Sequence, residues 1–158
     1  MKLYIKQKVF SWGDKFTVKD AAGVDRYFVE GEVFSFGKKL HVYDRHRREA
    51  VFIQQQLLTW MPRYSVFVNG QEMAQVVRKF TFLIPKYTIE GPGWDIEGDC
   101  FAHDYQIRKA GRTVAALRKA WMSWGDSYEL DIFDPADEIM ALAAVLAIDA
   151  AIESANNN

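Results

Sequence analysis

Apolar and polar residues alternate along most of the chain, from residue 2 to residue 133, and turn-forming residues interrupt the alternation at short intervals. A period of two in short segments is typical of β-strands that bury one face. Asn69-Gly70, flanked by alternating apolar residues, predicts a tight hairpin turn. The expected strands, about twelve in number, lie at 3–10, 16–18, 27–33, 40–42, 51–58, 64–68, 73–80, 87–89, 94–96, 105–107, 114–117 and 128–133.

Parts of this strand-rich region resemble one another, which indicates that one hairpin unit is reused. The matching pairs are 11–14 with 123–126, 62–66 with 85–89, and 64–78 with 105–119. An open sheet of so many strands would leave long exposed edges, whereas a closed sheet has none. The repeats therefore favour a closed barrel.

The pattern changes after residue 133. Asp134 followed by Pro135 is typical of a helix N-terminus, and the ten residues 139–148 include no polar side chain. We expect a helix over 135–152, about 27 Å long at about 1.5 Å per residue. Its apolar run is shorter than the roughly 20 residues that a membrane span requires.

A helix that is apolar on every side must be surrounded by protein. The alternative, a helix packed on one face of an open sheet, would show a polar stripe, and residues 139–148 have none. The predicted fold class is all-β with one helix: a closed barrel of about twelve mostly antiparallel strands around a central C-terminal apolar helix. We expect a single domain over 1–158, with strands over 2–133, the helix over 135–152 and a disordered tail over 154–158.

Composition supports one globular domain. The 158 residues have a mass of 18.2 kDa, and 49% are hydrophobic against 26% charged. The single cysteine excludes an intramolecular disulfide and a zinc site built from CxxC pairs. The first residues lack the apolar stretch of a signal peptide, so we expect a cytoplasmic protein.

Charge is unevenly distributed, although the net charge is only −1. All 20 lysines and arginines precede residue 120, and residues 120–158 contribute eight acidic side chains and no basic one. The acidic residues could simply decorate helix termini and solvent-facing positions. Alternatively, the molecule is polar, with a basic face that meets an anionic surface and an acidic segment directed away from it.

The chain resembles the LURP-one-related, YxjI-like family, which belongs to a broader group with the Tubby C-terminal fold and the phospholipid scramblases. The resemblance extends over about residues 2–153. The segments that carry it are Tyr4-Ile5-Lys6-Gln7-Lys8, Val29-Glu30-Gly31-Glu32-Val33, Tyr87-Thr88-Ile89-Glu90-Gly91, Trp94-Asp95-Ile96-Glu97-Gly98-Asp99 and Tyr105-Gln106-Ile107.

The resemblance implies a binding or scaffold domain rather than an enzyme. Tubby-like relatives bind phosphoinositides through a basic surface pocket, whose residues do not map one by one onto this chain. The scramblase relatives are associated with membranes, but the apolar helix here is too short to span one.

Residues 95–104 form the one cluster whose composition suggests a catalytic or metal site, with Asp95, Cys100, His103 and Asp104 among them. Strand alternation places Cys100 and His103 on opposite faces, and carboxylates beside a thiolate suit no single metal well. We therefore expect a polar strand–turn–strand, no metal, no cofactor and no catalytic residue. A small-molecule or metal-dependent enzyme centred on this segment is the alternative.

A basic run between residues 36 and 51 is the remaining candidate. Its predicted binding residues are Lys38, Lys39, Arg45, Arg47 and Arg48. Guanidinium groups on one turn can hold phosphate oxygens in pairs, although a charged turn can also serve solubility alone. The predicted function is a non-catalytic module that binds phosphorylated lipid headgroups or an acidic partner surface, peripheral to a membrane. Nucleic acid is not expected, because no recognised binding motif accompanies the run.

Overall fold

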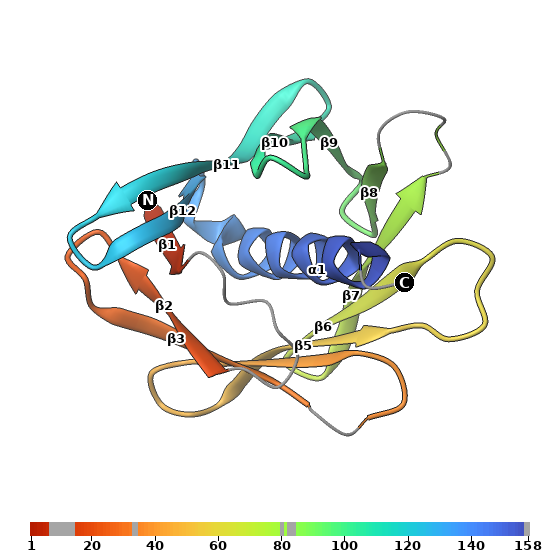
Figure 1. Cartoon of the computed structure of the whole chain (residues 1–158), viewed down its shortest axis with the longest axis horizontal. Helices are drawn as coiled ribbons and strands as arrows, with labels where there is room; N and C mark the ends of the chain where they lie inside the picture. The colour runs from red at the N-terminus through yellow and green to blue at the C-terminus, as the bar shows by residue number, and fades with distance from the viewer. Residues whose placement is uncertain (7–14, 33–34, 80, 82–84, 157–158) are drawn as a thin grey trace.

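The computed structural model describes residues 1–6, 15–32, 35–79, 81 and 85–156. Over these residues the chain forms twelve strands in one closed barrel and a helix that runs through it (Figure 1). The strands are β1 (Lys2–Lys6), β2 (Lys15–Asp20), β3 (Asp25–Gly31), β4 (Lys39–Tyr43), β5 (Glu49–Gln55), β6 (Arg63–Val68), β7 (Gln71–Lys79), β8 (Lys86–Glu90), β9 (Trp94–Asp99), β10 (Asp104–Lys109), β11 (Arg112–Met122) and β12 (Gly125–Ile132). The predicted fold class is confirmed.

Each strand pairs antiparallel with its neighbours in the chain, and β1 closes the barrel against β12. In that closing pair Leu3 lies opposite Leu130 and Ile5 opposite Tyr128. These side chains are buried because alternate positions of a strand point to the same face, and here that face is the barrel interior. The twelve-strand sheet therefore has no free edge.

The helix fills the interior. A 3-10 turn (Pro135–Asp137) leads into α1 (Glu138–Asn156), and the Asp134 carboxylate accepts a hydrogen bond from the backbone N–H of Ala136 at 3.0 Å. All residues of 141–148 are at most 1% exposed, so strands surround this stretch on every side. The central helix is confirmed, and the alternative of a helix on one face of an open sheet is wrong.

The helix extends further than the sequence predicted. It ends at Asn156, so residues 154–156 are helical rather than part of a disordered tail. The hydroxyl of Ser154 donates to the carbonyl of Ala150 at 2.9 Å and lies 2.7 Å from the hydroxyl of Tyr64. These bonds hold an additional turn against the barrel wall. Residues 157–158 lie outside the described part of the chain.

Most expected strands are present, with one instructive difference in β5. The strand expected over 51–58 ends at Gln55, so Leu57 and Leu58 belong to a loop. Leu58 has a positive φ of 58°, a conformation that a strand does not accommodate. The expected strand residues Val9, Phe10, Val33 and Phe80, and the tetrapeptide 11–14, lie outside the described residues.

Two hairpins that resemble each other in sequence also share their backbone geometry. Asn69 and Gly70 have φ values of 51° and 80°, and Ala110 and Gly111 have 48° and 81°. Positive φ at both central residues is the mark of a type I′ turn. The register of each hairpin shifts at the equivalent place, after Val66 in β6 and Ile107 in β10. The sequence repeat is therefore a structural repeat of strand, bulge and turn.

Candidate functional site

Three of the predicted binding residues form a compact tip on the turn between β4 and β5. This arginine tip comprises Arg45, Arg47 and Arg48, and all three residues are exposed. The Asp44 carboxylate accepts hydrogen bonds from the backbone N–H groups of His46 (2.8 Å) and Arg48 (3.1 Å) and pairs with the Arg48 guanidinium at 3.2 Å. These bonds, chiefly that from the Arg48 N–H, lower the pKa of Asp44. The turn is thus braced by its own carboxylate.

The two predicted lysines are not part of this tip. Lys38 and Lys39 lie at the opposite end of β4, about 13 Å away at about 3.3 Å per residue. The backbone N–H of Lys38 donates to the side-chain oxygen of Gln55 at 3.1 Å. Burial lowers the pKa of Lys38, and nearby Glu153 opposes this shift. The five residues therefore divide between the two ends of the barrel.

The arginine tip lies at the end where α1 begins. Arg26, Tyr27, Asp44, Arg45 and His46 line a shallow hollow of about 180 Å³ beside it. The hydroxyl of Tyr27 donates to Glu138 at 2.8 Å, and the guanidinium of Arg26 lies 3.3 Å from the same carboxylate.

This arrangement contradicts the expected separation of charge. Asp134, Asp137 and Glu138 belong to the acidic segment, yet they lie at the same end of the barrel as the arginine tip. The reason is topological, because the chain returns from β12 to the start of the helix at that end. The acidic segment therefore does not face away from the basic turn.

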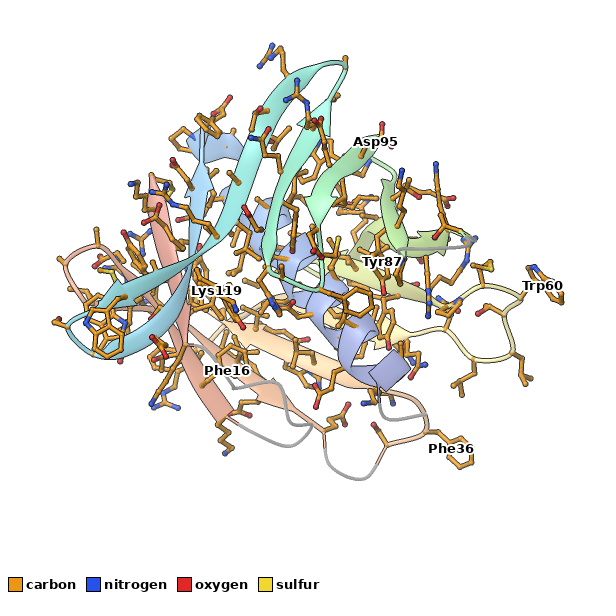
Figure 2. The ribbon with its side chains drawn as sticks, turned by 45° about the horizontal axis from the view of Figure 1, so that its top comes forward. Phe16, Phe36, Trp60, Tyr87, Asp95 and Lys119 are labelled. Atoms are coloured by element: carbon orange, nitrogen blue, oxygen red, sulfur yellow. The ribbon has the colours of Figure 1, made fainter. Side chains whose placement is uncertain are left out.

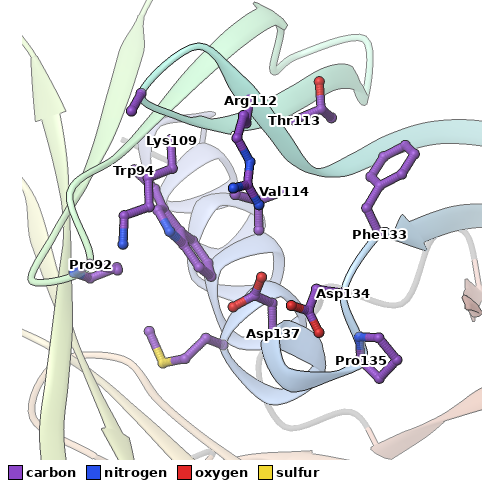
Figure 3. A pocket seen from close by; sticks show the side chains of 12 residues that line it. Pro92, Trp94, Lys109, Arg112, Thr113, Val114, Phe133, Asp134, Pro135 and Asp137 are labelled. Atoms are coloured by element: carbon purple, nitrogen blue, oxygen red, sulfur yellow. The ribbon is translucent and has the colours of Figure 1, made fainter.

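A larger pocket, of about 670 Å³, opens beside the start of α1 (Figure 3). Its apolar lining includes Trp94 and Val114. Lys109 and Arg112 come from the β10–β11 hairpin, and Asp134 and Asp137 from the segment that leads into the helix; the remaining lining residues include Pro92, Phe133, Pro135 and Met140. With two cations facing two carboxylates, the pocket has no net charge with which to select an anion.

Segment 95–104 forms the expected strand–turn–strand, but the side chains of its turn lie differently from the prediction. Residues 100–103 form a turn between β9 and β10, closed by a hydrogen bond from the N–H of His103 to the carbonyl of Cys100 at 3.2 Å. Strand alternation therefore does not apply. Cys100 is buried, and His103 turns toward Asp149 of the helix, with 3.0 Å between His103 Nε2 and Asp149 Oδ1. The expectation of opposite faces is wrong.

Asp149 is a buried carboxylate that the sequence analysis did not single out. Its contact with His103 has ion-pair distance but not hydrogen-bond geometry, so neither carboxylate oxygen has a hydrogen-bond partner among the described residues. Burial raises the pKa of Asp149, and His103 only partly opposes this shift. The hydroxyls of Tyr87 and Tyr105 are also buried without a partner in the described chain.

Cys100, His103 and Asp149 form an interior cluster whose thiol has low reactivity. Burial, followed by the negative charge of Asp149, raises the pKa of the Cys100 thiol to about 12. Such a thiol stays protonated at neutral pH and is a poor nucleophile. In the part of the chain that the structure describes, no three His, Cys, Asp or Glu side chains are grouped to hold a metal ion. Over the same residues, no helix is long and apolar enough to cross a membrane.

Comparisons with known proteins agree on the family and the fold. Residues 1–149 match the family described as LURP-one-related. The uncharacterized protein YxjI of Bacillus subtilis (strain 168) is 34% identical over 149 residues, which cover 94% of this chain and 92% of that protein. An X-ray structure of a protein from Arabidopsis thaliana superposes with a TM-score of 0.60 at 15% identity, covering 92% of this chain and 88% of that one. At that identity the likeness concerns the fold alone.

Proposed function

The chain belongs to the LURP-one-related family, and from this premise we propose that it is a non-catalytic binding domain whose arginine tip binds an acidic surface of a partner protein. The barrel interior is filled by α1, so a ligand must bind on the outside or at the ends. The tip is an exposed cationic group that the backbone of its turn holds in one place.

One observation carries the proposal. Arg45 and Arg47 are exposed on a turn that Asp44 braces, and among the described residues neither has a carboxylate within ion-pair distance. Guanidinium groups form paired, charge-assisted hydrogen bonds with carboxylates. Because the turn is already ordered, little conformational entropy is lost when it binds.

The surroundings of the tip favour a protein partner over a bilayer. At this end Asp134, Asp137 and Glu138 offset the nearby cations Lys109, Arg112 and Arg26, so a flat anionic membrane would find little net attraction outside the tip. A compact acidic segment can contact the tip without approaching these carboxylates. Binding of a phosphorylated lipid headgroup is the alternative outcome of the experiment below.

The interior cluster supports the non-catalytic part of the proposal. A buried thiol with a pKa of about 12 and an enclosed carboxylate have neither the reactivity nor the access that catalysis on a substrate needs. The predicted alternative, an enzyme centred on residues 95–104, would need both.

The test compares two charge-removal variants. We expect Arg45→Ser/Arg47→Ser/Arg48→Ser to abolish the binding of a fluorescent polyglutamate peptide, measured by anisotropy at low ionic strength. Lys38→Ser/Lys39→Ser, at the other end of β4, is the matched control and should bind normally. Wild-type binding should weaken as salt is added, because exposed charges are screened.

Three outcomes would count against the proposal. Undiminished peptide binding by the triple variant would exclude the tip, and binding that is insensitive to salt would exclude an electrostatic contact. Soluble inositol phosphates and phosphatidylserine vesicles form the other arms of the experiment. If the wild type binds either of these through the tip and ignores the peptide, the partner is a phosphorylated group instead.

A further inference from the structure

The end of the barrel opposite the arginine tip exposes large apolar side chains. Phe36 is 90% exposed, Leu58 105% and Trp60 95%, and Leu57 is half exposed. They lie on two neighbouring loops, 35–38 and 56–62, which we call the apolar loops. Figure 2 shows Phe36 and Trp60 directed away from the barrel, on the side where α1 ends.

The two apolar loops form one ordered platform. The backbone N–H of Gln55 donates to the carbonyl of Lys38 at 2.8 Å, and the N–H of Gln56 donates to the carbonyl of Arg63 at 2.9 Å. Leu57 packs against Gly37 so closely that a Cβ on the glycine would lie 3.1 Å from its methyl group. The exposed side chains are therefore held outward by an ordered backbone.

Packing within the described chain does not account for Leu58. Its side chain is fully exposed, and its φ of 58° is a conformation that leucine adopts only with strain. Glycine or asparagine would fit this position with less strain. Burial of this leucine against a further surface would offset the strain.

Cations surround the apolar loops. Lys79 and Lys86 lie opposite each other in the β7–β8 pair, and the neighbouring N–H of Arg78 donates to the carbonyl of Pro62 at 3.0 Å, next to the second loop. Lys39 lies beside the first loop at the start of β4. No carboxylate of the described residues is within ion-pair distance of Lys39, Lys79 or Lys86. Adjacent like charges of this kind favour an external anion.

We propose that this end of the barrel docks on an anionic phospholipid bilayer, with Phe36, Leu58 and Trp60 inserted at the boundary between headgroups and acyl chains. The lysines then lie at the level of the lipid phosphates. Tryptophan suits this depth, because its ring is apolar and its N–H can remain in the headgroup layer.

A bilayer fits these loops better than a protein surface does. The apolar side chains are separate protrusions rather than a flat patch, and protein interfaces are closely packed and complementary in shape. Fluid lipid can surround each protruding side chain, and the surrounding lysines match a negatively charged membrane.

This inference is independent of the arginine tip, because the two surfaces lie at opposite ends of the barrel. The 19 residues of α1 extend between them, a length of about 28 Å at about 1.5 Å per residue. With the apolar loops on the membrane, the arginine tip would face away from it and remain available to a partner.

The first experiment measures vesicle binding. Wild-type protein should sediment with phosphatidylcholine–phosphatidylserine vesicles and much less with phosphatidylcholine alone. Leu58→Ser/Trp60→Ser should lower the partition coefficient by about tenfold or more. Trp121→Ser is the matched control, because Trp121 is a 77% exposed tryptophan on β11, and it should leave binding unchanged. Both variants should keep the wild-type melting temperature, since these side chains bury little surface.

The second experiment reports insertion directly. Brominated lipids quench tryptophan fluorescence only when the indole reaches the acyl region. Vesicles that contain such lipids should remove the same absolute fluorescence intensity from the wild type and from Trp121→Phe, but less from Trp60→Phe. Because phenylalanine is also apolar, Trp60→Phe should still bind the vesicles.

Five results would overturn the proposal. The first is unchanged vesicle binding by Leu58→Ser/Trp60→Ser, and the second is equal quenching of the wild type and Trp60→Phe. The third is absence of vesicle binding by the wild type. The role of the arginine tip is tested separately, by the peptide assay. The fourth is a wild-type dimer that Leu58→Ser/Trp60→Ser converts to a monomer in analytical ultracentrifugation, which would assign the loops to a second copy of the chain. The fifth is loss of vesicle binding in the triple arginine variant but not in Leu58→Ser/Trp60→Ser, which would assign lipid binding to the arginine tip.

Discussion

Nε2 of His103 lies 3.0 Å from Oδ1 of Asp149, whose side chain is 1% exposed, and this contact ties the β9–β10 turn to the helix inside the barrel. The imidazole ring also stacks on Tyr128 of β12, with 4.2 Å between the ring centroids. His103 thus links three parts of the fold: a turn, the barrel wall and the central helix. Removing the His103 side chain should therefore destabilise more of the fold than its own turn.

Removal of His103 should destabilise the protein strongly. His103→Ala leaves the Asp149 carboxylate buried with no compensating group, and such changes lower the free energy of unfolding by about 3 kcal/mol or more. Urea unfolding at neutral pH measures the effect. His46→Ala, at the exposed β4–β5 turn, is the control and should change little. Adding Asp149→Asn to His103→Ala should recover most of the loss, and equal stability of the two histidine variants would contradict the prediction.

Asp149 should make the protein more stable as the pH falls. Burial raises the pKa of Asp149 above its ordinary value of 3.8, so the folded state takes up a proton before the unfolded state does. The resulting stabilisation is complete below pH 3.8 and is lost as the pH rises through the folded-state pKa.

This pH effect is best isolated as a difference. The free energy of unfolding of Asp149→Asn minus that of the wild type should grow as the pH rises from 3.8, because the variant has no carboxylate to ionise at this position. A difference that stays constant as the pH rises would show that the pKa of Asp149 is not raised in the folded state. Chemical denaturation at a series of pH values provides the measurement.

Leu146 should be among the least tolerant positions, because it is fully buried on a helix that strands surround. Leu146→Ala should lower the free energy of unfolding by about 2–5 kcal/mol. Leu146→Asp should prevent stable folding, because it places an unpaired charge in the core. Thermal unfolding followed by circular dichroism tests both changes, and an unchanged melting temperature for Leu146→Asp would refute the central position of the helix.

Arg118 should stabilise the closing strands of the barrel through Glu129. The carboxylate of Glu129 is nearly buried and accepts hydrogen bonds from the Arg118 guanidinium at 2.8 and 3.1 Å. Burial alone would raise the pKa of Glu129, but Arg118 and Lys2 outweigh it and hold the pKa below 4.5. Glu129 therefore contributes stability above pH 4.5 that is lost as the pH falls through the folded-state pKa.

Arg118→Ala should remove most of this contribution, leaving that of Lys2, and lower stability at neutral pH by about 1–2 kcal/mol. The control is Lys15→Ala, because both Lys15 and its partner Glu30 are exposed and such pairs contribute little. Equal losses in the two variants would show that the burial of Glu129 adds nothing to its ion pair.

The sequence contained enough information to predict the architecture. Residues 139–148 have no polar side chain, and only a surrounded helix avoids exposing such a segment to water. The Asn69-Gly70 turn was equally predictable, because type I′ turns strongly favour this residue pair. Both signals lie within short stretches of sequence, so they can be interpreted without knowing which distant segments pack together.

The sites were harder to predict, because they depend on where strands begin and end. Lys39 and Arg45 are near in sequence, yet β4 places them at opposite ends of the barrel. Leu57 and Leu58 continue the apolar alternation of β5 and look like core residues until the left-handed backbone of Leu58 is known. Asp149 gives no sign of its partner, since His103 lies on a distant turn.

The position of the helix after all twelve strands has a consequence for protein synthesis. The segment that fills the barrel is translated after the strands, and the closing pair of Leu3 and Leu130 joins the first strand to the strand made just before the helix. Until α1 has emerged from the ribosome, the strands have no interior to pack against, and their apolar faces remain exposed. Such distant pairings also form slowly. The domain must therefore complete its folding after translation of the helix, and nascent chains that stop short of α1 should be bound by chaperones.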